Sequence, residues 1–541
     1  MSLVREFLGA IREQVRQQQG DALRSWLQVD SSAGAQYHNL GAQLRAHFAT
    51  PASVDKVVEA CLPQDDVDDV PEGQATAWPG LQSFIKDYLV FWRDIDYDDL
   101  LGAHQLLSGL VNSCATAFAH PSYGAMLLQT SMSLSETLAR LTMMLSRRPD
   151  LIRQLRARGG SGFDEDKSVA ESSAEIIQKI FTTCLTDRSS GGRHSKPEGK
   201  RTGVYMFANL VLKLLFACRR THLAKMIFVN IASISPPLSL YPAAQRVTFL
   251  YYLGRFNLAN HHYRRAALCL EAAYLQTPAS FRAHRTTILA YLVPSNMLLG
   301  RFPSRALLAR PEAAAALAPV FRPLCQAVAA GNFAAFQAHL AAHEAWLLER
   351  GLLLPLASRL RPLLWRGLSR RAFLLTYVPP ADAASSRKAA TLDLAHLHTL
   401  AVYMQRRLEG WLPSRPDSAH HRPPHGNKLL LRAVSNSVVD AGLSTLAPPP
   451  GGPRRLRPNE GMVWGGAEVT YEHVETVVAA LVQQGLLHGF VAHGQARFAI
   501  MGAKAKGSPL LAGWPDVWQA IQSRQYEERF DLDEVPGWVK G

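Results

Sequence analysis

The sequence predicts a mainly α-helical protein, in which a tetratricopeptide-like helical-repeat solenoid is followed by a C-terminal winged helix. Two observations carry this prediction. Apolar residues recur at helical spacing between Pro and Gly residues, and no sustained alternation at period two occurs before Phe490. Towards the C-terminus, two amphipathic helical segments are followed by two short runs with the pattern of a β-hairpin.

Length and composition describe a large globular protein. The 541 residues leave room for several domains, and 48% hydrophobic residues exclude a disordered chain. We expect no signal peptide, because residues 1–6 lead straight into an amphipathic helix, and no apolar run reaches the ~18 residues of a membrane span. The cysteines are far apart and lack the spacing of a zinc or redox motif, which predicts reduced core thiols and the cytosol or nucleus: Cys61, Cys114, Cys184, Cys218, Cys269 and Cys325.

Residues 1–155 form a predicted N-terminal helical region, and charge is unevenly spread along the chain. Residues 51–100 hold twelve Asp and Glu against three Lys and Arg, whereas residues 351–460 hold sixteen Lys and Arg against six Asp and Glu. This asymmetry predicts an acidic end and an end that faces a polyanion. The alternative is that the basic residues form an ordinary solvated surface.

Residues 171–380 are predicted to form the helical repeats. Small residues at Gly254, Ala266 and Ala273 let two antiparallel helices approach closely, and Pro278 ends the pair. Such repeats bury a core only by stacking, and they present long surfaces to partners. Further helices are predicted at 205–229, 285–299, 319–330 and 333–348.

The winged helix is predicted over residues 385–505. Its first helix opens at Thr391-Leu392-Asp393-Leu394, and its second starts near Val469 and stops at Gly485, which occupies the left-handed stop position. Two strands around His493-Gly494 complete the module as a β-hairpin.

A long insertion at about 410–466 interrupts this module. Its proline-rich and arginine-rich composition predicts a mobile segment, with one candidate short helix at 428–443. Two polar, glycine-rich stretches at 158–162 and 186–203 are also predicted as loops, and residues 506–541 as a C-terminal tail.

The sequence predicts that the protein is not an enzyme and that it binds no cofactor or metal ion. It contains no Gly-x-Ser-x-Gly, Walker, His-Glu-x-x-His or Cys-x-x-Cys motif. The glycine-rich run 159–162 follows no predicted strand and lacks a phosphate-binding lysine, so we interpret it as a linker. The carboxylates between Asp65 and Asp69 lack the spacing of a calcium-binding loop.

Several strings resemble the PCI family, which is named after the proteasome lid, the signalosome and a translation initiation factor. Within it they are most similar to the PCI subunit of the nuclear-pore-associated transcription–export complex. The resemblance covers roughly residues 174–501. The matching strings are 182–188, 207–216, 239–256 (with Leu240-Tyr241-Pro242 and Leu253-Gly254-Arg255-Phe256), 294–303 and the two ends of the predicted winged helix.

The resemblance implies a non-enzymatic scaffold in the nucleus, at the nuclear pore or on transcribed chromatin. It implies a larger GANP-type PCI partner, a small acidic proteasome-lid-type subunit, and binding of single-stranded RNA and of double-stranded DNA. Such a complex couples transcription to mRNA export. The alternatives are a signalosome-associated-type PCI subunit of a transcription-elongation and splicing complex, or a pure protein–protein scaffold.

Two sets of residues are candidates for protein partners. The first set lies on the edge of the predicted hairpin and would bind the PCI partner: Phe490, Val491, Phe498 and Ile500. The alternative is that the apolar residues of this hairpin pack in the core of the module itself. The second set consists of arginines interleaved with apolar residues and would bind the acidic subunit: Arg359, Trp365, Arg366, Arg370 and Arg371. The alternative is that Trp365 belongs to the core and that the arginines are ordinary solvated charges.

Basic residues around the winged helix are candidates for nucleic-acid binding: Arg387, Lys388, Arg454, Arg455, Arg457, Arg497, Lys504 and Lys506. These three groups can converge on one face although they are far apart in sequence. Since no aromatic platform accompanies them, phosphate contact is expected more than base stacking. The alternative is that the arginines between 454 and 457 form a nuclear-import signal and the rest are solvated.

Overall fold

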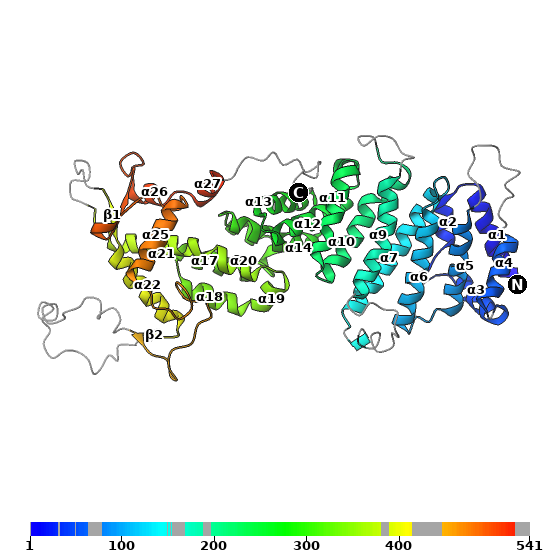
Figure 1. Ribbon diagram of the computed structural model, residues 1–541, viewed down its shortest axis with the longest axis horizontal. Helices are drawn as coiled ribbons and strands as arrows, with labels where there is room; N and C mark the ends of the chain where they lie inside the picture. Colours follow the sequence, from blue (N-terminus) through cyan, green and yellow to red (C-terminus); the bar gives the residue numbers. More distant parts are fainter. Residues whose placement is uncertain are drawn as a thin grey trace, which may run out of the picture. The chain divides into compact units, whose positions relative to one another are not determined.

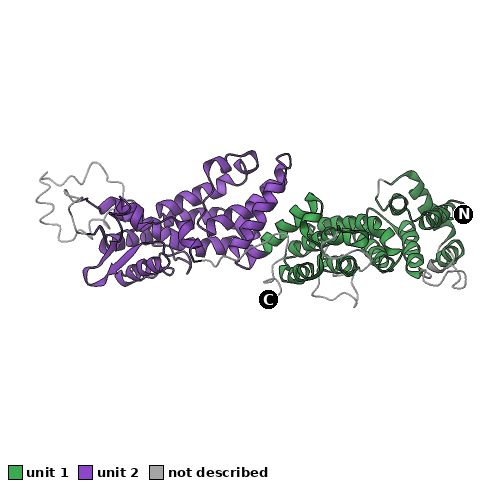
Figure 2. Cartoon of the chain, turned by 90° about the horizontal axis from the view of Figure 1, so that it is seen from above, with its two compact units in different colours: residues 1–256, 529–541 green, residues 257–528 purple. Residues whose placement is uncertain are grey.

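The computed structural model describes residues 2–30, 33–48, 50–62, 78–148, 150–151, 153, 168–187, 196–379, 389–413 and 446–524. The chain divides into two compact units (Figure 2): unit 1 is residues 1–256 with 529–541, and unit 2 is residues 257–528. Helices dominate both units, as predicted, and every strand in the described ranges belongs to unit 2.

Unit 1 is an array of helices, each packed on its neighbours (Figure 1). Its α-helices are α1 (Ser2–Arg16), α2 (Gly20–Trp26), α3 (Ala35–His47), α4 (Pro51–Cys61), α5 (Pro79–Asp94), α6 (Leu100–Phe118), α7 (Leu128–Ser146), α9 (Val169–Thr186), α10 (Val204–Ala217) and α11 (Ala224–Ile234); α12 (Ala243–Ala259) contains the point of division. Because α9 packs on both α6 and α7, the predicted N-terminal region and the first repeats share one core.

The core of unit 1 is rich in aromatic residues whose polar atoms are satisfied. Tyr88 and Trp92, both fully buried on α5, donate to the carbonyl of Gln28 at 2.6 and 3.2 Å. Trp92 also stacks on Tyr37 with ring centroids 5.4 Å apart. A buried aromatic ring contributes a large apolar area, and a hydrogen bond for its N–H or O–H avoids the cost of desolvation.

The segment predicted as a loop at 186–203 contains a buried lysine. Lys200 lies in a short 3-10 helix (Gly199–Gly203), where its Nζ donates to the carbonyl of His120 at 2.8 Å and lies 5.3 Å from the Phe118 ring. Burial lowers the pKa of Lys200. This end of the segment is therefore part of the core of unit 1, while residues 188–195 lie outside the described ranges.

The first part of unit 2 continues the helical repeats. Its helices are α13 (Tyr263–Gln276), α14 (Arg282–Leu298), α15 (Arg305–Leu308), α16 (Pro311–Ala314), α17 (Ala318–Ala330), α18 (Phe333–Ala342), α19 (Glu344–Glu349), α20 (Leu353–Arg359) and α21 (Arg361–Thr376). Ala266 and Ala273 are fully buried on α13, which packs on α14 and ends two residues before Pro278. The four further segments predicted as helical are helical.

Two glycines let α17 and α21 pack closely. Gly331 ends α17 with φ +64°, and Gly367 lies in the middle of α21. A Cβ atom on Gly367 would lie 2.6 Å from the carbonyl oxygen of Val328 and 2.8 Å from the nitrogen of Gly331. The contact is backbone to backbone, so no side chain can move aside to make room.

The C-terminal part of unit 2 is a small α/β module. It consists of β1 (Thr391–Asp393), α22 (Leu394–Leu408), α25 (Tyr471–Gln483), β4 (Gly489–Ala492) and β5 (Arg497–Ile500). The strands form an antiparallel sheet in the order β1-β5-β4, and α22 packs on α25. The helices and hairpin follow the predicted order, and Gly485 has the predicted left-handed conformation at φ +70°.

The start of this module differs from the prediction. Residues 391–393 are a strand paired with β5 and not the first turn of a helix. The helix begins at Leu394, directly after this strand, because the Asp393 side chain accepts a hydrogen bond from the backbone N–H of Ala395 and caps α22. At three residues, β1 is too short to show an alternating pattern.

The C-terminal end of the insertion, residues 446–466, is held in place and not mobile. The insertion closes on a two-stranded ladder of β2 (Leu412–Pro413) and β3 (Leu446–Ala447). Arg361 of α21 donates to the carbonyls of Asn459 (2.7 Å) and Met462 (2.9 Å), and Gln405 of α22 is bonded to Gly465 and Met462. The candidate helix at 428–443 and the loop at 158–162 lie outside the described ranges.

Part of the predicted C-terminal tail also folds into unit 2. It forms α26 (Pro509–Gly513) and α27 (Val517–Gln522). Trp514 between them is buried against Phe373 of α21, with ring centroids 5.1 Å apart, and donates to the Ser369 hydroxyl at 3.2 Å. This aromatic anchor was not used in the prediction.

Candidate interaction surfaces

Within the described ranges the sheet of the α/β module has two edge strands, β1 and β4, and the edge of β4 is the one that carries an exposed aromatic side chain. Among the described strands, β4 pairs with β5 alone, whereas β5 pairs with β4 on one side and β1 on the other. Phe490 on β4 is 52% exposed and Val491 is half-buried. Phe498 and Ile500 on β5 are buried in the module's core, as the alternative reading of the sequence held.

Exposed apolar side chains extend this edge. His488, immediately before β4, donates through its backbone N–H to Gly513 at 2.9 Å and accepts from the N–H of Met501. Near these contacts Met501 is 46% exposed and Leu511 is 65% exposed. Neither residue was among the predicted contacts, and the place of Leu511 depends on the packing of α26 against β5.

The insertion arginines are largely engaged within the protein. Arg454 pairs with the buried Glu460 at 3.0 Å, and Arg457 pairs with Glu344 of α19 at 3.5 Å. Glu460 also accepts from the backbone N–H of Arg457 at 3.1 Å, so this carboxylate organises the loop. Arg455 is exposed and has no ion pair within the described ranges.

The described members of the predicted basic groups lie near opposite ends of α22. Arg497 lies opposite Asp393, the residue that caps the start of α22, whereas the N–H of Arg454 donates to Glu409 at the end of α22. A helix of 15 residues is about 22 Å long, so the two groups belong to opposite ends of an element of that length. Figure 1 shows the corresponding segments at opposite sides of α22, the loop between β5 and α26 at one side and the chain around β2 at the other.

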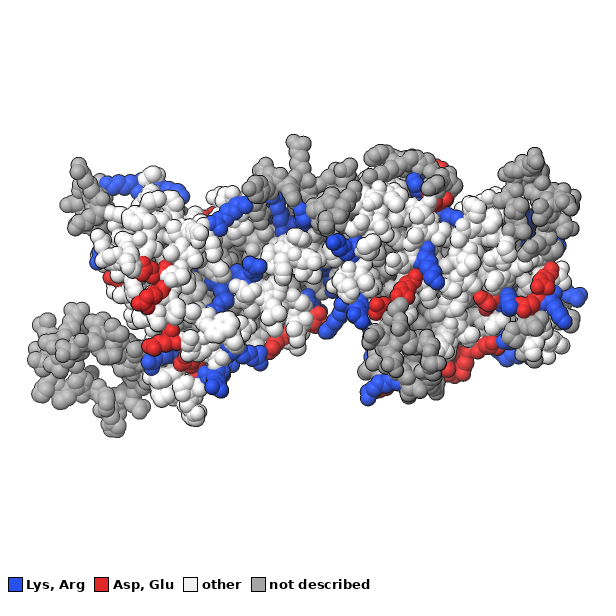
Figure 3. Space-filling model, viewed as in Figure 1, with Lys and Arg blue, Asp and Glu red and all other residues white. Residues whose placement is uncertain are grey.

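The described basic residues therefore form two smaller groups, one near each end of α22, where a single surface was predicted. Arg497, Lys504 and Lys506 are exposed on β5 and the loop that follows it. Figure 3 shows basic side chains at both the upper and lower margins of this part of unit 2, with acidic side chains between them. Arg387 and Lys388 lie outside the described ranges, although the described Ala390 just after them accepts from the N–H of Ile500 at 2.9 Å.

The residues proposed to hold an acidic subunit separate into core and surface. Trp365 is only 4% exposed and packs edge-on against Phe333, so it belongs to the core. Arg366 donates to the carbonyls of Leu486 (3.2 Å) and Pro515 (2.7 Å) and thereby ties α21 to the α/β module. Burial lowers the pKa of Arg366. The exposed remainder is Arg359, Arg370 and Arg371.

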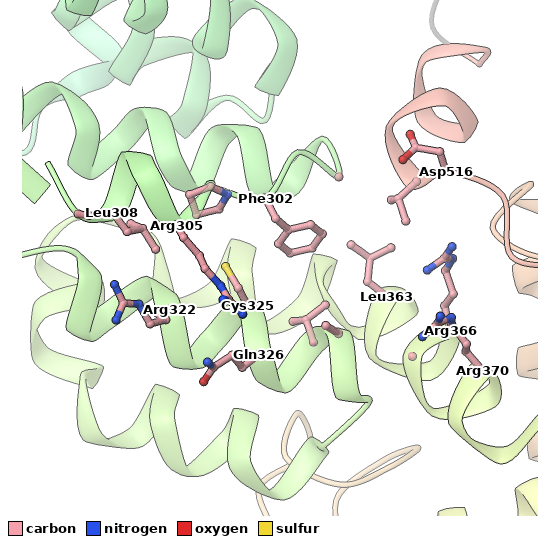
Figure 4. Close-up of a pocket in the computed structure, with 17 residues that line it drawn as sticks. Phe302, Arg305, Leu308, Arg322, Cys325, Gln326, Leu363, Arg366, Arg370 and Asp516 are labelled. Carbon is pink, nitrogen blue, oxygen red and sulfur yellow. The ribbon is translucent and has the colours of Figure 1, made fainter. Parts of the chain in front are cut away.

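Arg366 and Arg370 also line a groove of about 840 Å³ in unit 2 (Figure 4). Arg305 and Arg322, from α15 and α17, lie across the groove from them, and the single carboxylate in its lining is Asp516. Apolar side chains form much of the remaining surface: Phe302, Leu308, Val328, Leu363 and Val517. No local sequence pattern predicted this groove, because its lining comes from separate segments between residues 300 and 517.

The described part of the chain shows no sign of a metal site or of a membrane span. No cluster of three or more His, Cys, Asp or Glu side chains is arranged to hold a metal ion within it. None of its helices is both long and apolar enough to cross a bilayer. All six cysteines are unpaired; Cys114, Cys184 and Cys269 are buried and the other three half-buried.

Comparison with known proteins identifies relatives of this chain. No family model matches the chain. A PCI domain-containing protein of Schizosaccharomyces pombe is 29% identical over 297 residues, 54% of this chain and 64% of the relative. A PCI domain-containing protein 2 homolog of Drosophila melanogaster is 31% identical over 252 residues, 45% of this chain and 61% of the relative. The chain is related to PCI domain-containing proteins.

Other relatives carry a second name. A protein of Schizosaccharomyces pombe called CSN12 homolog is 27% identical over 255 residues, 46% of this chain and 58% of the relative. The chain thus spans about three fifths of the length of these curated relatives. The PCI part of the resemblance is supported, and the relatives include both PCI domain-containing protein 2 and CSN12 homologs.

Proposed function

We propose that this PCI-related chain is a non-enzymatic scaffold subunit that pairs with a second, larger PCI protein of the GANP type through β4. The observation that carries this proposal is the uncovered edge of β4 with the half-exposed ring of Phe490 on it. An unpaired edge offers backbone N–H and C=O groups to a strand of a partner. Because Phe490 is already half-buried, covering its ring would contribute about half of the ~1.5–3 kcal/mol of a fully buried side chain to the free energy of binding.

Substitution of Phe490 tests this pairing. Because Phe490 lies outside the core, Phe490→Glu should leave circular dichroism and the melting temperature unchanged, yet abolish co-purification with the GANP-type partner. The matched control is Leu348→Glu on α19, where the side chain is 60% exposed and distant in sequence from the sheet. Retained pairing by the Phe490 variant, or equal loss in both variants, would contradict the proposal.

We propose further that the complex binds single-stranded RNA or double-stranded DNA through the basic groups beside β5. Three exposed cations lie there on one short stretch, Arg497, Lys504 and Lys506, and Arg455 offers a second contact point at the other end of α22. Contacts from these side chains to phosphates tolerate any base sequence and weaken steeply with salt. A small acidic subunit is proposed to bind the exposed arginines at α20 and α21, Arg359, Arg370 and Arg371.

The complex that we propose is a nuclear one that couples transcription to mRNA export at the pore, as the resemblance implies. The CSN12 homologs among the relatives favour a second candidate, a signalosome-associated-type subunit of a transcription-elongation and splicing complex. Affinity purification with mass spectrometry separates the two. Co-elution of a GANP-type protein supports export; co-elution of elongation or splicing factors without it supports the second candidate.

A further inference from the structure

The last part of the insertion, residues 454–468, forms a loop that leaves a tryptophan in water; we call it the Trp464 loop. Trp464 is 67% exposed, whereas the other tryptophans that the structure describes are buried or half-buried. Two apolar neighbours in the same loop are buried, Met462 at 1% and Leu456 at 9% exposure. Tryptophan is highly buried on average. An indole ring that the fold leaves in solvent, while burying its neighbours, indicates a contact with a ligand.

The Trp464 loop is held by contacts of the residue next to the ring. The N–H of Gly465 donates to the carbonyl of Pro458 at 3.0 Å, and the carbonyl of Gly465 accepts from the side chain of Gln405 on α22 at 3.0 Å. Gly461 lies so close that a Cβ on it would collide with the carbonyl oxygen of Gly465. Because these contacts fix the backbone beside Trp464, a ligand of the ring would bind with little ordering of the loop.

Arginines share this loop with the exposed ring. A Cβ on Gly465 would lie 3.6 Å from the carbonyl oxygen of Arg457, so the backbone of this arginine is adjacent to the residue after Trp464. The side chains of Arg454 and Arg457 are 55% and 70% exposed although each pairs with one carboxylate, and Arg455 is exposed with no ion pair in the described ranges. A guanidinium carries five N–H donors, so one carboxylate partner leaves donors for a phosphate.

A ring in this setting fits an unpaired nucleobase better than it fits a protein. A tryptophan that anchors a protein interface is surrounded by contacts that exclude water. Here Leu456 and Met462 are buried, and charged side chains such as Arg455 and Glu468 are exposed in the same loop. A base can stack on the face of the indole ring while its phosphates contact the arginines. Paired bases already stack inside their duplex, so the ring can receive only an unpaired one.

We propose that Trp464 stacks on one unpaired base of a single-stranded nucleic acid, with Arg455 and Arg457 contacting the flanking phosphates. This inference rests on the proposed nucleic-acid binding and makes it more specific. The cations beside β5 contact phosphates of single and double strands alike, whereas the Trp464 loop favours single strands. From the sequence, phosphate contact was expected more than base stacking, because only the folded loop shows which of the tryptophans is exposed.

The test compares the wild-type chain with Trp464→Ala, each purified together with the proteins that co-purify with it. The probe is a fluorescent oligoadenylate of about twelve nucleotides, a length within the range of sites that combine stacking and phosphate contacts. By fluorescence anisotropy, Trp464→Ala should bind it at least about fivefold more weakly. The slope of log affinity against log salt concentration should stay unchanged, because a stacking contact releases no counterions. Trp464→Phe keeps an aromatic face and should retain more of the affinity than Trp464→Ala.

Two matched probes and one matched variant isolate the stacking contact. An abasic oligonucleotide of the same length keeps the phosphates but lacks the bases, so the wild-type chain and Trp464→Ala should bind it equally. A blunt duplex of the same length offers no unpaired base and should not distinguish the two chains either. Leu354→Ala on α20 removes a side chain that is also 67% exposed but has no aromatic ring, and it should bind every probe as the wild-type chain does.

The opposite results separate this inference from the function on which it rests. If the wild-type chain binds oligoadenylate and Trp464→Ala binds it equally well, nucleic-acid binding stands and the stacking contact does not exist. An equal loss of affinity for the abasic probe would also overturn the inference, because the ring would then act on phosphate contacts. If Trp464→Ala keeps its affinity for RNA but loses a co-purifying protein, the ring anchors a protein. A wild-type chain that binds none of the probes refutes nucleic-acid binding itself, and this inference with it.

Discussion

At the scale of single residues, buried polar side chains hold the helices of unit 1 in register. His104 on α6 lies within 3.2 Å of the Thr142 hydroxyl on α7 and 3.0 Å of the Ser173 hydroxyl on α9, and the two hydroxyls are 3.0 Å apart. Three helices therefore meet at one buried cluster. Burial lowers the pKa of His104 to about 4, because the charged imidazolium would lose its hydration there.

This cluster predicts a loss of stability in acid. The unfolded chain takes up a proton at His104 near pH 6.5 and the folded chain only near pH 4, so the unfolded state binds more protons between these values. As the pH falls through this window, His104 should cost up to roughly 3 kcal/mol of unfolding free energy. Urea unfolding at pH 7 and pH 5 measures the part of this cost that arises above pH 5, about 2 kcal/mol.

The His104→Asn variant should lose part of that pH dependence. The exposed His47 of the same unit provides the control, because His47→Asn removes an imidazole without a buried environment. A pH dependence that is the same in the His104 variant and in the wild-type chain would rule out the assignment.

At the scale of elements, periodicity predicted the helices well because amphipathic faces bury locally. The helix ends at Gly485 and before Pro278 were predictable for the same reason: a glycine stop or a proline acts on its own few residues. Residues 391–393 were misread because a strand so short has no period, and its pairing partner lies about a hundred residues away in β5.

The same locality explains the errors at the candidate surfaces. Phe498 belongs to the core because its ring packs against the buried Trp514 of a separate segment, which no local pattern reveals. The insertion was predicted to be mobile from its composition, yet Arg361 and Gln405 fix its last part through contacts about 60 to 100 residues distant. The lining of the groove is assembled in the same way from separate segments.

The close approach of α17 and α21 gives a prediction for one element pair. Gly367→Ala would place a Cβ 2.6 Å from the carbonyl oxygen of Val328, so the helices must separate, at a cost of about 1–3 kcal/mol or more. Thermal unfolding of the purified chain measures this cost. Gly109→Ala on α6 is the control: nothing lies within 4 Å of its Cβ position, and a helical alanine should stabilise by about 0.5–1 kcal/mol. A neutral Gly367→Ala variant would contradict the packing described.

At the scale of the whole molecule, the net charge of +14 is distributed over several separate sites. Some arginines act inside the protein, as Arg361 and Arg366 do through backbone carbonyls. Others form ion pairs, as Arg454 does with Glu460. Only the remainder can meet a polyanion without first breaking a contact, and this distinction cannot be drawn from composition.

The proposed nucleic-acid binding should follow this division. Arg497→Glu, Lys504→Glu and Lys506→Glu together remove three exposed cations beside β5. In a plot of log affinity for single-stranded RNA against log salt concentration, the slope should become shallower by about 2, because each phosphate contact contributes roughly 0.7. Arg455→Glu should flatten it by no more than about 0.7. Binding isotherms of the assembled complex at several salt concentrations measure both slopes.

Charge reversal at Arg454 should act differently, because a new carboxylate there would face the buried Glu460 that it now pairs with. We expect Arg454→Glu to lower the melting temperature of unit 2, whereas Arg455→Glu should not. If Arg454→Glu instead leaves the melting temperature unchanged and weakens RNA binding as much as the triple variant at β5, the ion pair with Glu460 is not what holds this arginine. The insertion would then contribute to the nucleic-acid surface as much as the residues beside β5.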